Sequence, residues 1–155
     1  YQDELNRIRL SKSPDIDVLF YGAINERRKH IIDKLVESKI KVKCLFGEYG
    51  EKRDKWIANS KLVLNMHMYD SKVFEIIRVF YLMTNSVPVV SEYDKNTKIN
   101  YKYLDGFKTS PYDELIKNII NLVGNKIARK ELGNKGSSLI KKYPQEEFTK
   151  KILNL

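Results

Sequence analysis

The sequence predicts an α/β fold, in which a parallel sheet of about five strands is covered by helices on both faces and the C-terminal end is helical. Short apolar runs rich in β-branched residues alternate with segments of helical periodicity, the pattern of repeated βαβ units. A chain of 155 residues with 42% hydrophobic content can bury one core. One compact parallel-sheet domain is therefore expected.

The N-terminal half is predicted to contribute three strands. The apolar run from Asp15 to Tyr21 predicts a buried strand that ends at Gly22. Residues 26–38 place apolar side chains at helical spacing, with charged residues on the other face. The remaining elements predicted in this half are a strand at 41–46, a short helix at 52–59 and a strand at 62–66.

The C-terminal half begins with an almost wholly apolar helix at 73–84, which predicts burial on all sides. A strand is predicted at 87–91 and a short fifth strand at 103–108. Ser110 and Pro111 give a helix start, because proline is favoured in the first helical turn. Two further helices are expected: one at 124–142, interrupted or weakened at Gly133 and Gly136, and one from Pro144 with Phe148, Ile152 and Leu153 inward.

Domain boundaries follow from the same patterns. Residues 1–14 are polar and predict a linker or a helical lead-in, and residues 15–155 predict a single domain. The chain begins at Tyr1 rather than at methionine, so a fragment of a longer protein is expected.

Charge and composition restrict the classes of partner. The net charge of +9 favours an anionic partner, although a lysine-rich solubilising surface explains it equally well. The single cysteine, Cys44, excludes disulfide frameworks and zinc sites and favours a reducing compartment. No apolar run reaches the roughly 18 residues of a membrane span, so we expect a cytoplasmic protein without one.

Candidate binding residues follow the ends of the predicted strands. In a parallel sheet the carboxyl ends of the strands and the adjacent helix N-termini form the ligand crevice. The loop from Gly22 to Arg28 opens a helix there and carries Arg27, but an ordinary turn with solvated arginines explains it too. His67 and Lys72 flank the next such loop, where a histidine can bind phosphate or be a satisfied structural group.

Two charged residues, Glu75 and Arg78, lie in the apolar segment three positions apart. Charged groups rarely enter a buried helix without a partner or a task. They can pair with each other, or Arg78 can bind a diphosphate while Glu75 orients it or binds a sugar hydroxyl. Glu92 ends the fourth predicted strand, where it can bind a ribose or lie solvated.

These features together resemble the C-terminal, nucleotide-sugar-binding domain of GT-B glycosyltransferases, in a family 1/4-like subgroup. The resemblance rests on Asn65, His67 and Tyr69 after one strand, on Glu75 and Arg78, and on the run from Val89 to Glu92. The opening run from Asp17 to Arg28 resembles the first strand and the phosphate-side loop of the same domains. The resemblance implies a Rossmann-like domain, which is one half of a GT-B fold.

The resemblance also implies an activity: transfer of a sugar from a nucleotide diphosphate to an acceptor held by an N-terminal domain of the same protein. The nucleotide sugar is then a substrate, and neither a cofactor nor a metal is expected. The fragment alone is expected to bind nucleotide weakly and to be inactive. Arg78 and Lys72 would face the diphosphate, Gly22 and Asn25 would allow the sugar phosphate to approach closely, and Glu92 would hold the nucleoside.

One position departs from the pattern of that family. Tyr81 occupies the place where many of these enzymes have a glutamate that holds the donor ribose. The tyrosine hydroxyl could replace that contact, or Glu92 could take the role. Two other functions remain open on the residues alone: a basic nucleic-acid-binding module and a scaffold domain without chemistry.

Overall fold

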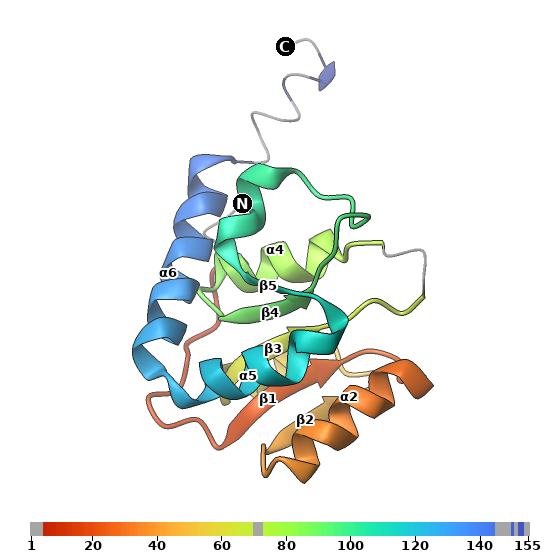
Figure 1. Cartoon of the computed structure of the whole chain (residues 1–155). Coiled ribbons are helices and arrows are strands. Elements are labelled where there is room, and N and C mark those ends of the chain that lie inside the picture. Colours follow the sequence, from red (N-terminus) through yellow and green to blue (C-terminus); the bar gives the residue numbers. More distant parts are fainter. Residues whose placement is uncertain (1–4, 70–72, 145–149, 151, 154–155) are drawn as a thin grey trace.

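The computed structural model describes residues 5–69, 73–144, 150 and 152–153. Its centre is a five-stranded parallel sheet in the order β2-β1-β3-β4-β5 (Figure 1). The strands are β1 (Ile16–Tyr21), β2 (Val42–Leu45), β3 (Ser60–Asn65), β4 (Val89–Glu92) and β5 (Lys108–Ser110). The parallel Rossmann-like sheet and its helices confirm the predicted fold class.

Helices cover both faces of the sheet. The helices are α2 (Glu26–Glu37), α3 (Gly50–Ala58), α4 (Ile76–Thr84), α5 (Leu115–Gly124) and α6 (Lys126–Lys142), with 3₁₀ turns η1 (Tyr101–Gly106) and η2 (Tyr112–Glu114). Core residues of α2 and α5 pack together on one face, and core residues of α3, α4 and α6 pack on the other. Figure 1 shows α4 and α5 on opposite sides of the sheet.

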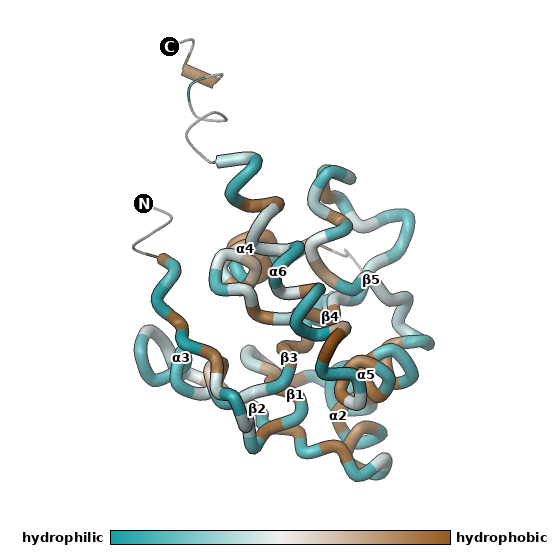
Figure 2. Tube along the Cα trace, turned by 90° about the vertical axis from the view of Figure 1, so that its left-hand side faces the viewer, coloured by the Kyte–Doolittle hydropathy of each residue, from teal (hydrophilic) through white to brown (hydrophobic). Residues whose placement is uncertain are grey.

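The alternation of side chains in β1 divides the core into two layers. Val18 and Phe20 point toward α2 and α5, and Leu19 and Tyr21 point toward α3 and α4. Figure 2 shows hydrophobic stretches of the chain along the strands at the centre of the molecule. Tyr21 is therefore the last side chain of β1 on the α4 face.

Three sequence-based expectations differ from the structure. The fifth strand lies at 108–110, because most of the predicted segment at 103–108 forms η1 instead. The helix α6 runs without interruption through Gly133 and Gly136. Ile152 and Leu153 are exposed rather than inward, while Phe148 lies outside the described residues.

The apolar helix also differs, since it begins at Ile76 instead of Val73 and is not buried on all sides. Ile77 is 85% exposed and Ile76 is 47% exposed, whereas Val79, Leu82 and Met83 are fully buried. Glu75 therefore sits at the N-terminal boundary of α4, outside the helix. Ahead of the sheet, residues 5–14 pack on the domain: Ile8 is buried and its amide donates to the Oδ1 of Asn85 at 2.8 Å.

Candidate functional site

A cleft of about 1050 Å³ lies at the carboxyl edge of the sheet, on the face that carries α3 and α4. Its walls come from the end of β1, the loop between β2 and α3, and the first turns of α4. The charged residues that line it are Arg7, Glu48, Arg53, Glu75 and Arg78. Aromatic side chains line much of the rest: Tyr21, Phe46, Tyr49, Phe74, Phe80, Tyr81, Tyr103 and Tyr143. A mostly apolar hollow with a few charged groups is typical of a site for an organic anion.

Arg78 and Gly22 lie side by side in this cleft. Gly22 has a φ of +132°, and a Cβ atom there would lie 3.2 Å from Nη2 of Arg78. Glycine therefore permits both the backbone turn and the close approach of the guanidinium. The Nη1 of Arg78 donates to the Oδ1 of Asn65 at 3.2 Å, and its guanidinium forms an ion pair with Glu75. These contacts hold the cation at the cleft wall, with 18% of the side chain exposed.

Arg28 is a second arginine behind the cleft, and it is buried. Its Nη2 lies 3.0 Å from the Oε1 of Glu75, so Glu75 lies between two guanidinium groups. Arg28 also donates to the carbonyl oxygens of Ala23, Met66 and His67. Burial lowers the pKa of Arg28, and the nearby Glu75 carboxylate opposes that shift. The residue that appeared solvated in the sequence thus connects the loop after β1 with the segment between β3 and α4.

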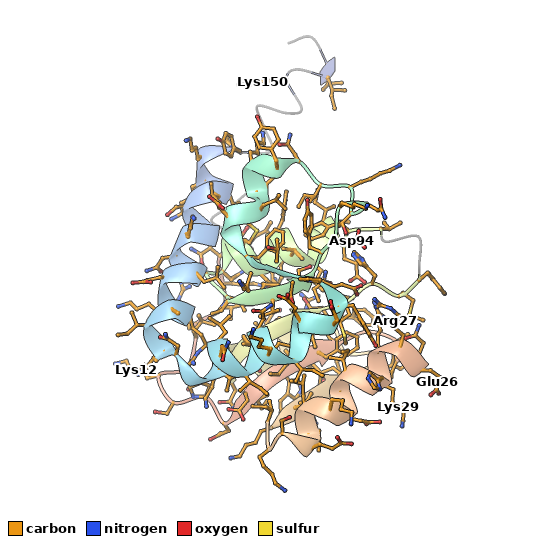
Figure 3. All side chains as sticks on the ribbon, in the orientation of Figure 1. Lys12, Glu26, Arg27, Lys29, Asp94 and Lys150 are labelled. Carbon is orange, nitrogen blue, oxygen red and sulfur yellow. The ribbon has the colours of Figure 1, made fainter. Side chains whose placement is uncertain are left out.

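Glu92 is bound within the protein. Its carboxylate forms a double hydrogen bond with Arg27 and accepts from the backbone N–H of His67 at 3.0 Å, and the residue is only 3% exposed. The guanidinium of Arg27 also stacks on the ring of Tyr112, 3.9 Å from its centroid. In Figure 3 the labelled Arg27 and Asp94 lie on the same side of the molecule, opposite Lys12. Glu92 therefore fixes the ends of β3 and β4.

Two other candidate residues also have structural partners. The ring of His67 lies between the carbonyl oxygen of Val73 at 3.2 Å and the Oγ1 of Thr97 at 3.3 Å. Asn25 caps α2 by accepting from the N–H of Arg28 at 3.0 Å, and its Nδ2 donates to the oxygen of Met68 at 2.7 Å. Both side chains hold the loops that follow β1 and β3.

Tyr81 lines the cleft, but its hydroxyl is engaged. It donates to the Oδ2 of Asp54 at 2.7 Å and accepts from the Nε of Arg7 at 3.2 Å. Burial, followed by the hydrogen bond to Asp54, raises the pKa of Tyr81. A ligand oxygen would have to displace Asp54 or Arg7 to reach this hydroxyl.

The predicted site residues thus fall into two groups. Gly22, Glu75, Arg78 and Tyr81 line the cleft, and Asn25, Arg27, His67 and Glu92 are not among its lining residues. The second group adjoins the first through Arg28, which contacts both Glu75 and the His67 carbonyl oxygen. Lys72 lies outside the described residues.

Sequence reasoning missed several residues of the cleft. Tyr21, Arg53 and Arg7 line it, as do Phe46 and Tyr49, which are 81% and 77% exposed. The position of Tyr21 at the end of a predicted strand was a usable signal, and so were the glycines on either side of Tyr49. Nothing in the local sequence indicates that Arg7 reaches this edge.

Comparison with solved structures shows a glycosyltransferase-like fold. A crystal structure of TarM superposes with a TM-score of 0.62 at 17% identity, covering 94% of this chain and 36% of TarM. A second structure, of a Staphylococcus aureus TarM mutant in complex with Fondaparinux, alpha-GlcNAc-glycerol and UDP, gives a TM-score of 0.60 at 16% identity. It covers 95% of this chain and 37% of that protein. The five-stranded domain matches one half of a GT-B fold.

Comparison with curated sequences finds uncharacterized proteins of Acanthamoeba polyphaga mimivirus. Protein L138 is 34% identical over 121 residues, and protein L140 is 30% identical over 112 residues. These matches cover 75% and 70% of this chain but only 14% and 37% of the two relatives. The chain thus spans a small part of the length of these relatives. No protein family matches it.

Two features are not found within the described residues, a membrane-spanning helix and a metal site. In that part of the chain no helix is long and apolar enough to cross a membrane. Within the same residues, no group of three or more His, Cys, Asp or Glu side chains is placed to hold a metal ion.

Proposed function

We propose that this chain is the donor-binding domain of a glycosyltransferase and binds a nucleotide-diphosphate sugar in the cleft at the carboxyl edge of its sheet. The observation that carries the proposal is Arg78, a partly exposed cation at the wall of an apolar cleft, beside a glycine with positive φ. The likeness to TarM supports the choice of ligand, because one TarM crystal contains UDP.

Arg78 would provide the main electrostatic contribution. A leaving nucleoside diphosphate gains negative charge as the bond to the sugar breaks, and a fixed guanidinium lowers the energy of that state. The first turn of α4 lies at the same wall, where Ile76 and Ile77 line the cleft, and the N–H of Ile76 already donates to the carbonyl oxygen of Phe74. Glu75 positions Arg78 through their ion pair and keeps the guanidinium oriented before the ligand arrives.

An acceptor-binding domain outside this chain would complete the enzyme. Exposed apolar side chains, Phe46, Tyr49 and Ile77, lie at the edge of the cleft. The acceptor or the second domain can cover them. The catalytic base, where the reaction uses one, would then come from the second domain. The chain alone is expected to bind nucleotide without transferring sugar.

Nucleotide titration by calorimetry, with UDP and GDP compared, tests this function. The Arg78→Gln variant removes the cation but keeps a polar side chain, and affinity should fall about 10- to 100-fold, the effect of losing a charged hydrogen bond. Arg78→Lys keeps the charge without the planar fork and should recover part of the affinity.

The matched control is Arg9→Gln, which removes one positive charge from an exposed arginine that is not among the cleft residues. Its affinity for the nucleotide should equal that of the parent chain. Circular dichroism must show that both variants fold. The proposal fails if neither UDP nor GDP binds, or if Arg9→Gln weakens binding as much as Arg78→Gln does.

A further inference from the structure

The hydroxyl of Tyr21 is a buried polar group without a partner. Among the described residues it is the one buried side-chain nitrogen or oxygen for which no hydrogen bond is found. Buried tyrosine hydroxyls normally find a partner, because an unpaired buried polar group costs free energy. An exception at the end of β1, in a side chain that lines the cleft, indicates a group reserved for a ligand.

Two other tyrosines, one on each face of the sheet, show that the fold can satisfy such hydroxyls. Tyr81 in the same cleft donates to Asp54 at 2.7 Å, and Tyr112 donates to the carbonyl oxygen of Arg27 at 2.7 Å. Tyr21 differs in that two guanidinium groups lie against its ring, and the nearby Glu75 carboxylate makes no hydrogen bond to its hydroxyl. The guanidinium of Arg78 lies 4.7 Å from the centre of its ring and that of Arg53 lies 5.6 Å away. Neither guanidinium can accept a hydrogen bond.

We propose that the Tyr21 hydroxyl donates a hydrogen bond to an anionic phosphate oxygen that Arg78 and Arg53 draw into the cleft. The chemistry is complementary: an oxyanion accepts several hydrogen bonds, and it is attracted by both guanidinium groups. This inference deepens the proposed function and rests on it for the nature of the ligand. It names Tyr21, which lies in the run from Asp17 to Arg28 but was not among the binding residues expected from the sequence.

The Tyr21 hydroxyl carries the proton that a hydrogen-bond donor needs. Burial raises the pKa of Tyr21 to about 12, so the hydroxyl keeps its proton throughout the neutral range. The Arg78 guanidinium lies against the ring and the hydroxyl is buried, so the proposed contact requires Arg78 to turn toward the incoming anion. The ion pair between Arg78 and Glu75 would be exchanged for one with the ligand in that step.

The Tyr21→Phe variant separates a binding role from a structural one. It keeps the ring on which both guanidinium groups stack and removes only the unpaired hydroxyl. A structural hydroxyl would lower the melting temperature when removed, whereas an unpaired one should leave it unchanged or raised. Binding of UDP and of inorganic pyrophosphate should weaken about 10-fold or more, as expected for a lost hydrogen bond to a charged acceptor.

The control is Tyr101→Phe, which removes the hydroxyl of a tyrosine that is 84% exposed and is not among the cleft residues. It should bind both probes as the parent chain does. Equal affinity of Tyr21→Phe and the parent for UDP and pyrophosphate would overturn the role of Tyr21 and leave the proposed function standing.

The two probes separate this inference from the proposed function. Binding of pyrophosphate that depends on Tyr21, without binding of UDP or GDP, would support the anion contact and contradict the nucleotide-sugar function. If neither UDP nor pyrophosphate binds, both the Tyr21 contact and the proposed function are overturned.

Discussion

Residues at the carboxyl edge of the sheet have two kinds of role: some hold the loops together, and others face the cleft. Arg28 and Glu92 are 2% and 3% exposed and satisfy buried partners, whereas Arg78 is held by Asn65 and Glu75 with part of its side chain exposed. Breaking a buried ion pair is costly because one charge remains without compensation in a poorly solvated site. Substitutions at the two kinds of position should therefore act on different measurements.

Arg28→Gln should destabilise the fold strongly. The shorter neutral side chain leaves the carbonyl oxygen of Met66 without its donor, removes one of the two arginine donors to that of His67, and removes one partner of Glu75. We expect a loss of about 3–5 kcal/mol in the free energy of unfolding, as for other broken buried pairs. Denaturant unfolding measures it.

The adjacent Lys29 is the control for this prediction. Lys29→Gln removes the same charge from an exposed side chain that pairs with Asp33, four residues on along α2. Its unfolding midpoint should match that of the parent chain, because exposed pairs contribute little. Similar losses for both variants would contradict the structural role assigned to Arg28.

The site could be predicted from the sequence only in part, for a reason visible in these residues. Arg78 and Gly22 were found because strand ends and interrupted apolar patterns are local signals. The partners of Glu92 and His67 were not, because Arg27 is 65 residues from Glu92 and Thr97 is 30 residues from His67. Spacing along a chain does not reveal which charges meet across a fold.

Among the elements, the packing of α6 beside α4 shows that close contacts can override the helix propensity of a sequence. The glycines of α6 predict a weakened helix from intrinsic propensity, yet the helix is continuous. Both glycines face other backbone segments: Gly136 approaches Gly106 in η1, and Gly133 approaches Ser86 in the turn after α4. They allow α6 to lie close to these two segments.

Gly133→Ala should therefore destabilise the protein, although alanine is the better helix former by about 1 kcal/mol. A Cβ atom at position 133 would overlap the carbonyl oxygen of Ser86, and the backbone would have to move. Overpacking of this kind costs about 1–3 kcal/mol, measurable by thermal or denaturant unfolding.

Gly124→Ala is the matched control within the same region. Gly124 ends α5, and a Cβ atom there meets nothing within 4 Å. Its variant should keep or slightly raise the melting temperature. If Gly133→Ala proved as stable as Gly124→Ala, the close approach of α6 to Ser86 would be wrong.

The order of strands and helices was predictable because each element has its own periodicity, but the depth of burial was not. The apolar run before Thr84 predicts a helix buried all round, whereas Ile76 and Ile77 face outward at the mouth of the cleft. In the same way, Tyr103 and Leu104 pack on the core from a 3₁₀ turn instead of a strand. An apolar segment indicates that its surface will be covered. It does not indicate which other part of the molecule covers it.

At the scale of the whole molecule, the sheet has two hydrophobic layers, and the layer on the α4 side ends at the cleft. Tyr21 marks that end: Leu19, two residues before it, is fully buried, and Gly22 after it turns the chain at the cleft wall. Burial of tyrosines at this edge links the stability of the domain to alkaline pH. Tyr21, Tyr81 and Tyr112 all have pKa values raised above the usual 10.0, with burial as the first cause.

We expect the free energy of unfolding to fall as the pH rises from about 10 to about 12. The pKa of Tyr21 is raised from 10.0 in the unfolded chain to about 12 in the folded one, so the unfolded state loses its proton first. The stabilisation is complete below pH 10 and is lost as the pH rises through the folded value. At about 1.4 kcal/mol per pKa unit, Tyr21 alone contributes roughly 2–3 kcal/mol to this loss.

Denaturant unfolding of the parent and of Tyr21→Phe at pH 9 and pH 11.5 isolates that contribution. The difference in unfolding free energy between the two pH values should be smaller in the variant, because phenylalanine carries no proton to lose. Tyr101→Phe should keep the full difference, since its exposed hydroxyl meets similar solvent in both states. Equal pH dependence in all three proteins would show that the Tyr21 hydroxyl is hydrated in the fold, and would remove the unpaired group on which its binding role is based.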